Sequence, residues 1–304
     1  MNSTSLVDAF PFSTTVGITD NDKKKTYGIF DCIDTDGTFI ITNLLSYLKQ
    51  QQQQQQQQQT KVPKILWIGC GPFTSQSQNI IQALKKSNCD FGRTLPSSLW
   101  IHCIPTDLAT HVFSPTKNDS DEMKDDDDWD SNEYLRKLIQ TIQLQITKMT
   151  TSGNEEEVVM VLDDVTALSM LVGNTNAFYF LQKLRSMNHT IIFKCSHELE
   201  SQKDLPLVHN KPIQRQQMPW IAAGGGSSSS GGRYDSSHYW ESTLVDLADE
   251  IIDVLPLPSG FSKQVHGRII FTSRSSTNIS STMVNFYLSE TQGVKIMRLR
   301  SKQN

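Results

Sequence analysis

The residues best suited to chemistry lie near the middle of the chain, where five apolar residues, Val158 to Leu162, run into Asp163 and Asp164. A short, continuous apolar run predicts a strand that is buried on both faces of a parallel sheet. Carboxylates at the carboxyl end of such a strand are placed to hold a metal-bound nucleotide. The structural alternative, that Asp163 bonds strand-end amides and Asp164 caps the next helix, is favoured from these residues alone.

A nucleotide site also needs a phosphate-binding loop, and the sequence lacks the usual G-x-x-x-x-G-K-[S/T] form. The loop would follow the first predicted strand, where the residues read Asp-Thr-Asp-Gly-Thr. Carboxylates there repel phosphate and offset the helix N-terminal dipole. We therefore interpret the loop as a tight turn that caps a helix. Any nucleotide site here is vestigial and would consist of Asp34, Thr35, Asp36, Gly37, Asp163 and Asp164.

A second turn, in the segment WIGCGPFT, has a G-x-G pattern between a predicted strand and a predicted helix. Class I methyltransferases bind S-adenosylmethionine at such a turn, because its glycines let the cofactor approach closely. Here Phe73 stands at the third glycine position and Trp67 stands where an acid is usual. A turn that leads into a helix is favoured. The enzyme alternative is a stand-alone S-adenosylmethionine-dependent methyltransferase that uses Gly69 and Gly71.

The remaining reactive side chains show no catalytic or metal-binding spacing. The seven histidines form no metal pattern, so we expect no metal ion, no cofactor and no catalytic residue. No apolar run approaches the roughly 20 residues that cross a bilayer, and the first residues do not resemble a signal peptide. The five cysteines lack a C-x-x-C pair and predict free thiols in a reducing compartment, the cytoplasm, the nucleus or both: Cys32, Cys70, Cys89, Cys103 and Cys195.

Charge is distributed unevenly along the chain. The net charge is −4, but residues 117–130 hold eight acids and two lysines, which leaves +2 on the remainder. Residues 258–304 hold seven basic residues against one acid. A basic end permits a nucleic-acid partner, although charge alone favours a solvated strand face with a charged tail. The candidate RNA contacts are Arg298, Arg300 and Lys302.

Predicted strands and helices alternate along most of the chain, and three antiparallel strands follow at its end. This order predicts an α/β fold with a mostly parallel sheet and an antiparallel C-terminal edge. RecA-like domains of the P-loop NTPase type are built this way, here without a Walker A loop. We expect one RecA-like domain over 26–304, with a disordered N-terminus (1–25), a polyglutamine insertion (50–60), an acidic loop (114–130) and a flexible Gln/Gly/Ser-rich loop (198–237).

Four blocks of the sequence together resemble the Elongator complex protein 6 family, whose members are accessory subunits of the Elongator complex. The blocks are residues 28–49, 64–81, 158–173 and 260–274. The residues that carry the resemblance are Thr35-Asp36-Gly37, Phe73 with Ser75, Leu162-Asp163-Asp164-Val165, and Gly260-Phe261 with Val265-His266-Gly267.

The resemblance implies a RecA-like fold without a working phosphate loop. It implies assembly with two paralogous accessory subunits into a hetero-hexameric ring, which binds tRNA and works with the core Elongator subunits that modify the wobble uridine. The iron–sulfur and acetyl-CoA chemistry then belongs to another subunit. Any ATP hydrolysis belongs to the assembled ring, so the chain is not an independent ATPase. A DNA-binding RecA paralogue of the recombination type is a third reading, against which the Gly260–Gly267 block argues.

Overall fold

The computed structural model describes residues 4–6, 10, 24–32, 36–55, 64–71, 77–86, 99–107, 130–150, 158–197, 236–257, 259, 262–274, 279–289 and 293–297. Within these residues ten strands form one sheet in the order β1-β10-β9-β8-β7-β2-β6-β5-β3-β4. The strands are β1 (Thr4–Ser5), β2 (Thr26–Cys32), β3 (Lys64–Gly69), β4 (Leu99–Cys103), β5 (Val158–Asp163), β6 (Thr190–His197), β7 (Glu250–Leu255), β8 (Gly267–Arg274), β9 (Ile279–Ser289) and β10 (Gly293–Met297).

The sheet has a parallel part and an antiparallel part. The strands β4, β3, β5, β6, β2 and β7 pair in parallel, and β8, β9, β10 and β1 continue the sheet with antiparallel pairing. All residues of β2 and β5 are buried, as expected for strands that are covered on both faces. The prediction of an α/β fold with a mostly parallel sheet and an antiparallel C-terminal edge is confirmed.

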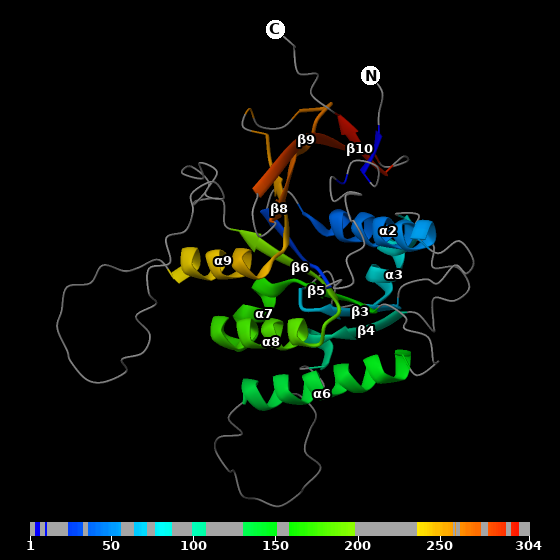
Figure 1. The fold of residues 1–304 in the computed structure, drawn as a ribbon. Coiled ribbons are helices and arrows are strands. Elements are labelled where there is room, and N and C mark those ends of the chain that lie inside the picture. The colour runs from blue at the N-terminus through cyan, green and yellow to red at the C-terminus, as the bar shows by residue number, and fades with distance from the viewer. Residues whose placement is uncertain are drawn as a thin grey trace, which may run out of the picture.

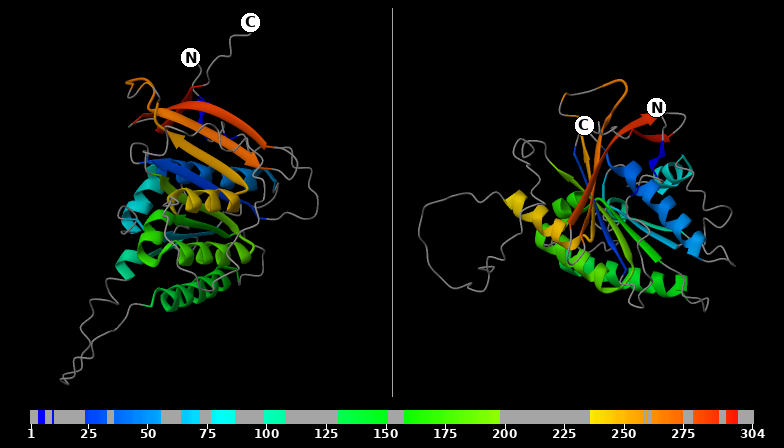
Figure 2. Two further views of the ribbon diagram at one scale, coloured as in Figure 1. Left: turned by 90° about the vertical axis from the view of Figure 1, so that its left-hand side faces the viewer. Right: turned by 45° about the horizontal axis from the view of Figure 1, so that its top comes forward.

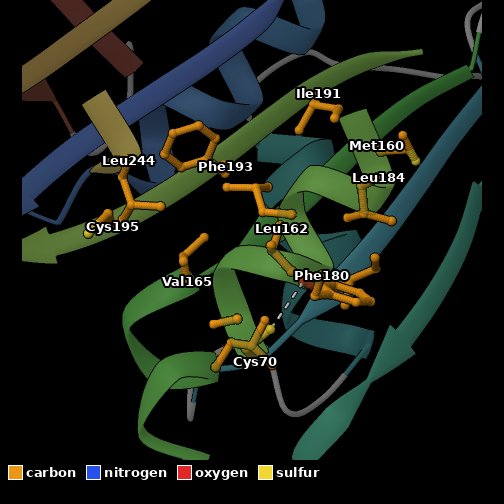
Figure 3. Packing of buried hydrophobic residues seen from close by; sticks show 14 of the residues in the cluster. Cys70, Met160, Leu162, Val165, Phe180, Leu184, Ile191, Phe193, Cys195 and Leu244 are labelled. Carbon is orange, nitrogen blue, oxygen red and sulfur yellow. Dashed lines mark hydrogen bonds between the residues drawn. The ribbon is translucent and has the colours of Figure 1, made fainter. Parts of the chain in front are cut away.

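Helices cover both faces of the parallel part, and each set encloses its own apolar core (Figures 1 and 2). Figure 3 shows the second of these cores, in which Phe180 and Leu184 pack near Leu162 and Phe193 of the sheet. The helices on the first face are α2 (Thr38–Gln55) and α3 (Ser77–Lys86), and those on the second are α6 (Ser131–Thr150), α7 (Val165–Val172), α8 (Asn174–Ser186) and α9 (Ser236–Leu247).

The expectation of a disordered N-terminus is wrong for Thr4–Leu6 and Phe10. The short strand β1 pairs with β10 at the edge of the sheet. The side chains of Leu6 and Phe10 are 1% and 6% exposed and belong to the core under α2. The centroid of the Phe10 ring lies 5.3 Å from the ring centroid of Tyr47 and 5.5 Å from the ring centroid of Phe271. Two apolar side chains therefore anchor a segment whose composition is otherwise typical of a disordered end.

Helix α2 continues into the polyglutamine tract as far as Gln55. Glutamine is a good helix former, so a helix that is already nucleated extends into such a tract. Residues 56–60 lie outside the described residues. So do 114–129 of the expected acidic loop and 198–235 of the expected flexible loop, whereas Asp130 precedes α6 and α9 begins at Ser236.

Replacing Gly267 by alanine is expected to lower the free energy of unfolding by about 1–3 kcal/mol, because the new methyl group overpacks the core. A Cβ at Gly267 would lie 2.5 Å from the carbonyl oxygen of Leu255 and 2.7 Å from Cε1 of Phe286. The backbone of β7 at Leu255 and the buried ring of Phe286 cannot move away without a loss of stability. Urea unfolding measures the change, and Ser273→Ala on the same strand is the control. Equal unfolding curves for the two variants would contradict the prediction.

Candidate functional site

The candidate site lies at the carboxyl ends of β2, β6 and β5, three neighbouring parallel strands. Asp31 is near the end of β2, Asp163 is the last residue of β5, and Lys194 lies in β6 between them. Side chains alternate between the two faces of a strand. Since Ile29, Val161 and Ile192 belong to the core under α2, the residues two positions further on point to that same face. The strand order thus brings two carboxylates and one ammonium together.

The ammonium of Lys194 is the centre of this site. Its Nζ lies 3.2 Å from Oδ1 of Asp163, 3.4 Å from Oδ1 of Asp36 and 3.8 Å from Oδ2 of Asp31. It also donates a hydrogen bond of 3.2 Å to Oγ1 of Thr38. The side chain of Lys194 is 11% exposed, and those of Asp31 and Asp163 are 2% and 3% exposed. One nearly buried cation therefore contacts two carboxylates that are close in sequence, those of Asp31 and Asp36, and a third from a distant part of the chain, that of Asp163.

The electrostatics of the site follow from burial and from this one cation. Burial raises the pKa of Asp163 to about 6, although Lys194 acts to lower it. Burial likewise raises the pKa of Asp31. Partial desolvation opposes ionisation of Asp36, whose side chain is 69% exposed, but Lys194 and the hydrogen bonds from Thr38 outweigh it, so the pKa of Asp36 is lowered. Burial acts to lower the pKa of Lys194, but the surrounding carboxylates act more strongly in the opposite direction. The pKa of Lys194 is therefore raised above its ordinary value, and the ammonium stays charged.

The loop before α2 forms the capping turn that the sequence predicts. Oδ1 of Asp36 accepts hydrogen bonds from the backbone N and from Oγ1 of Thr38, at 2.9 and 2.6 Å. The backbone N of Gly37 donates to Oδ2 of Asp31 at 2.6 Å. Asp34 and Thr35, the other two predicted residues of this loop, lie outside the described residues. Asp36 is thus a cap and a partner of Lys194 at the same time.

The two central aspartates have different roles. Asp164 is the N-cap of α7, since its Oδ1 accepts a 2.6 Å hydrogen bond from the backbone N of Ala167, and this confirms the capping interpretation. The carboxylate of Asp163 instead faces Lys194, so the expectation that it bonds strand-end amides misses its main partner. The amides at this strand end, those of Cys70 and Gly71, bond to the backbone carbonyl of Asp163.

Sequence reasoning found no lysine for this site, and the structure corrects that. No local pattern indicates that Lys194 belongs to this site, because it lies 158 residues after Asp36 in the sequence. Asp31 and Ser196 were missed as well. Oγ of Ser196 donates to Oδ1 of Asp31 at 2.7 Å and lies 3.3 Å from Oδ2 of Asp164. The available signal was a single charged residue inside the apolar run TIIFKCSH, because a buried lysine needs an acidic partner.

The other predicted site residues lie at the end of β3 or outside the described residues. Arg298, Arg300 and Lys302 follow β10 directly and lie outside them. Gly69 ends β3, and the thiol of the neighbouring Cys70 is buried, which raises its pKa well above the ordinary value. Within the described ranges, no group of three or more His, Cys, Asp or Glu side chains is arranged to hold a metal ion. The helices in those ranges include none with the length and apolar character needed to cross a membrane.

No protein-family model matches the chain, and no curated protein matches it.

Replacing Asp164 by alanine is expected to lower the free energy of unfolding by about 1 kcal/mol, because α7 loses its N-cap. Asp164→Ser is the matched control, since a serine hydroxyl still accepts from the amide of Ala167. Both variants remove the charge that repels Asp163. Urea unfolding of the two proteins therefore isolates the cap, and equal stability would contradict the capping role.

Raising the pH from about 4 to about 6 is expected to destabilise the protein through Asp163. The pKa of this carboxyl is about 6 in the fold, above its ordinary value of 3.8. Over that range the folded state holds a proton that the unfolded state has lost, so stability falls as the pH rises. The loss amounts to up to about 3 kcal/mol. Because Asp163→Asn lacks the titrating carboxyl, its stability should not show this loss. Parallel pH dependences of the wild type and the variant would contradict the raised pKa of Asp163.

Proposed function

We propose that this chain is a non-catalytic subunit of the hetero-hexameric accessory ring of Elongator, where it supports tRNA binding and wobble-uridine modification. The observation that carries the proposal is the position of Lys194, whose ammonium lies between the acidic end of β5 and the turn that opens α2. An ATPase of the P-loop type needs this space for phosphate and its metal. In this chain the Lys194 side chain fills that space, which argues against ATP hydrolysis by this subunit.

The sheet supports a RecA-like fold for this subunit. The strand β6 lies between β2, which precedes the first loop, and β5, which carries the aspartates. The parallel strands then continue into an antiparallel edge, as the order of predicted strands and helices leads one to expect. Domains of this kind pack side by side in rings, and a member without turnover still contributes its surfaces. The two paralogous accessory subunits and the core Elongator subunits are the partners that the proposal requires.

Affinity purification of the tagged full-length chain at moderate salt, followed by mass spectrometry and a native mass, tests this function. We expect two related RecA-like subunits in a particle of hexamer size. A monomer without these partners would refute the ring. Binding of S-adenosylmethionine by that monomer would favour the methyltransferase alternative.

The tRNA part of the proposal has its own test. Neutralising Arg298, Arg300 and Lys302 together is expected to weaken tRNA binding by the assembled ring and to reduce the salt dependence of that binding, because each phosphate contact releases counterions. The matched control neutralises Lys137, Lys148 and Lys183, which lie on α6 and α8. Equal loss in both triple variants would refute a specific role for the C-terminal residues.

A further inference from the structure

The antiparallel part of the sheet has one face that no described helix covers. The core under α2 takes side chains from β8, β9 and β10, among them Ile269, Val284 and Ile296. The core on the other side of the sheet reaches only as far as Ile251 of β7. In the left view of Figure 2, β8 and β9 face the viewer with no helix in front of them. These strands therefore present an outer face on the side opposite α2.

The side chains on the outer face follow from alternation along each strand. Since Ile269, Phe286 and Ile296 point toward α2, the residues one position away point to the outer face. Met283 on this face is 46% exposed, whereas Val284 is 3% exposed. The outer face consists of His266, Arg268, Ile270, Met283, Asn285, Tyr287 and Lys295. An antiparallel sheet commonly leaves one face to water, but this face carries an aromatic pair and cations as well.

The aromatic pair is formed by His266 and Tyr287. Their ring centroids lie 4.6 Å apart, with an angle of 47° between the ring planes. The Nδ1 of His266 accepts a 3.1 Å hydrogen bond from the backbone N of Leu288, which fixes the imidazole. The imidazole in turn supports the Tyr287 ring, which is still partly exposed. A tyrosine ring that is already held in place loses little conformational entropy when a flat ligand stacks on it.

Two cations flank the Tyr287 ring. Lys295 of β10 is its direct cross-strand partner, and Arg268 of β8 is opposite Asn285, two residues before Tyr287. The Cβ atoms of such neighbours are about 5 Å and about 7–8 Å from that of the central residue. Neither cation makes a side-chain hydrogen bond or ion pair with any described residue, and the Arg268 Nε is buried without a partner. The strands β8, β9 and β10 contain no acid. The charge of this face therefore calls for an anionic partner.

A supported aromatic ring between unpaired cations has the chemistry that binds single-stranded nucleic acid. Unpaired bases stack on aromatic side chains, while lysine and arginine bind the phosphates. A duplex keeps its bases stacked on one another and offers no free base to Tyr287. A protein partner matches less well, because protein interfaces are depleted in lysine and an unpaired buried charge is costly there.

We propose that the outer face binds a single-stranded segment of RNA, with an unpaired base stacked on Tyr287 and the neighbouring phosphates bound by Arg268 and Lys295. This goes beyond the proposed function, which places the RNA contacts at three residues after β10. It rests on that function for the choice of RNA over DNA.

The contribution of the ring is tested with an unstructured, fluorescein-labelled RNA of about 12 nucleotides and the full-length chain, by fluorescence anisotropy. Tyr287→Leu keeps an apolar side chain but removes the aromatic face. It is expected to raise the Kd about 5- to 150-fold, as the loss of one base–aromatic stack does. Tyr287→Phe keeps the ring and should bind as the wild type does. So should the matched control Tyr179→Leu, which replaces an exposed tyrosine on α8.

The contribution of the cations is tested by the salt dependence of the same binding. Arg268→Gln/Lys295→Gln should raise the Kd and reduce the slope of log Kd against log salt by about 1.4, because each phosphate contact on a single strand contributes about 0.7. The matched control Arg136→Gln/Lys183→Gln makes the same change of charge on α6 and α8 and should leave the slope unchanged.

A photocross-link in the wild type makes the test independent of how the variants fold. RNA that contains one 4-thiouridine should cross-link to β9 in the peptide that holds Tyr287. Cross-links confined to elements other than β8, β9 and β10 would overturn the proposal, as would equal affinities of Tyr287→Leu and Tyr179→Leu. A duplex RNA whose affinity responds equally to Tyr287→Leu would overturn the stacking role, and tighter binding of single-stranded DNA would overturn the choice of RNA.

These measurements use the isolated chain, so their failure is distinct from a failure of ring assembly. A chain that forms no ring but binds RNA through Tyr287 would refute the ring and support the outer face as an RNA site. A chain that enters the ring but shows no dependence on Tyr287 would do the reverse.

Discussion

Replacing Lys194 by methionine is expected to lower the free energy of unfolding by about 3–5 kcal/mol. Methionine keeps most of the volume of lysine but not its charge, so Asp163 and Asp31 remain nearly buried without their shared cation. Burial of an unpaired carboxylate is costly, and part of the cost appears as proton uptake because the pKa of Asp163 rises further above about 6. Urea unfolding at pH 7 measures the loss.

A double variant shows whether the loss comes from the buried charge. Lys194→Met/Asp163→Asn removes both partners of the closest ion pair and should recover part of the stability that Lys194→Met loses. Lys183→Met, on the exposed side of α8, should change stability by no more than about 0.5 kcal/mol. A Lys194→Met protein as stable as Lys183→Met would show that the cluster does not need its cation.

Phe10→Ala is expected to lower the free energy of unfolding by about 3–5 kcal/mol, although this residue lies in a segment that composition describes as disordered. The Phe10 side chain is 6% exposed and packs between Tyr47 of α2 and Phe271 of β8. Its removal leaves a cavity lined by rings that the strands and the helix hold in place. Thermal and urea unfolding measure the effect.

Leu6→Ala is a second probe of the same segment, and it should cost about 2–5 kcal/mol because Leu6 is 1% exposed. Gln182→Ala on the exposed side of α8 is the control and should stay within about 0.5 kcal/mol of the wild type. If Phe10→Ala and Leu6→Ala both unfold as the control does, the N-terminal segment does not contribute to the core.

Local features of this chain could be read correctly from the sequence. The apolar run Val158–Leu162 is a fully buried strand, as its composition requires. Asp164 caps α7, and Asp36 caps the turn before α2, because each carboxylate bonds an amide only two or three residues away. Gly173 separates α7 from α8 at a φ of 83°, a conformation that glycine adopts without a steric penalty.

The contacts that only the tertiary structure revealed join residues that are distant in sequence. No local pattern shows that β6 lies between β2 and β5, and only that order brings Lys194 to Asp31, Asp36 and Asp163. The same holds for Phe10, whose ring partners come from α2 and β8. The sequence by itself thus determined the buried strands, their helices and the caps, since burial and hydrogen bonding to near neighbours fix these. The tertiary structure alone decided which charges meet, because Coulomb energy depends on distances that strand order sets.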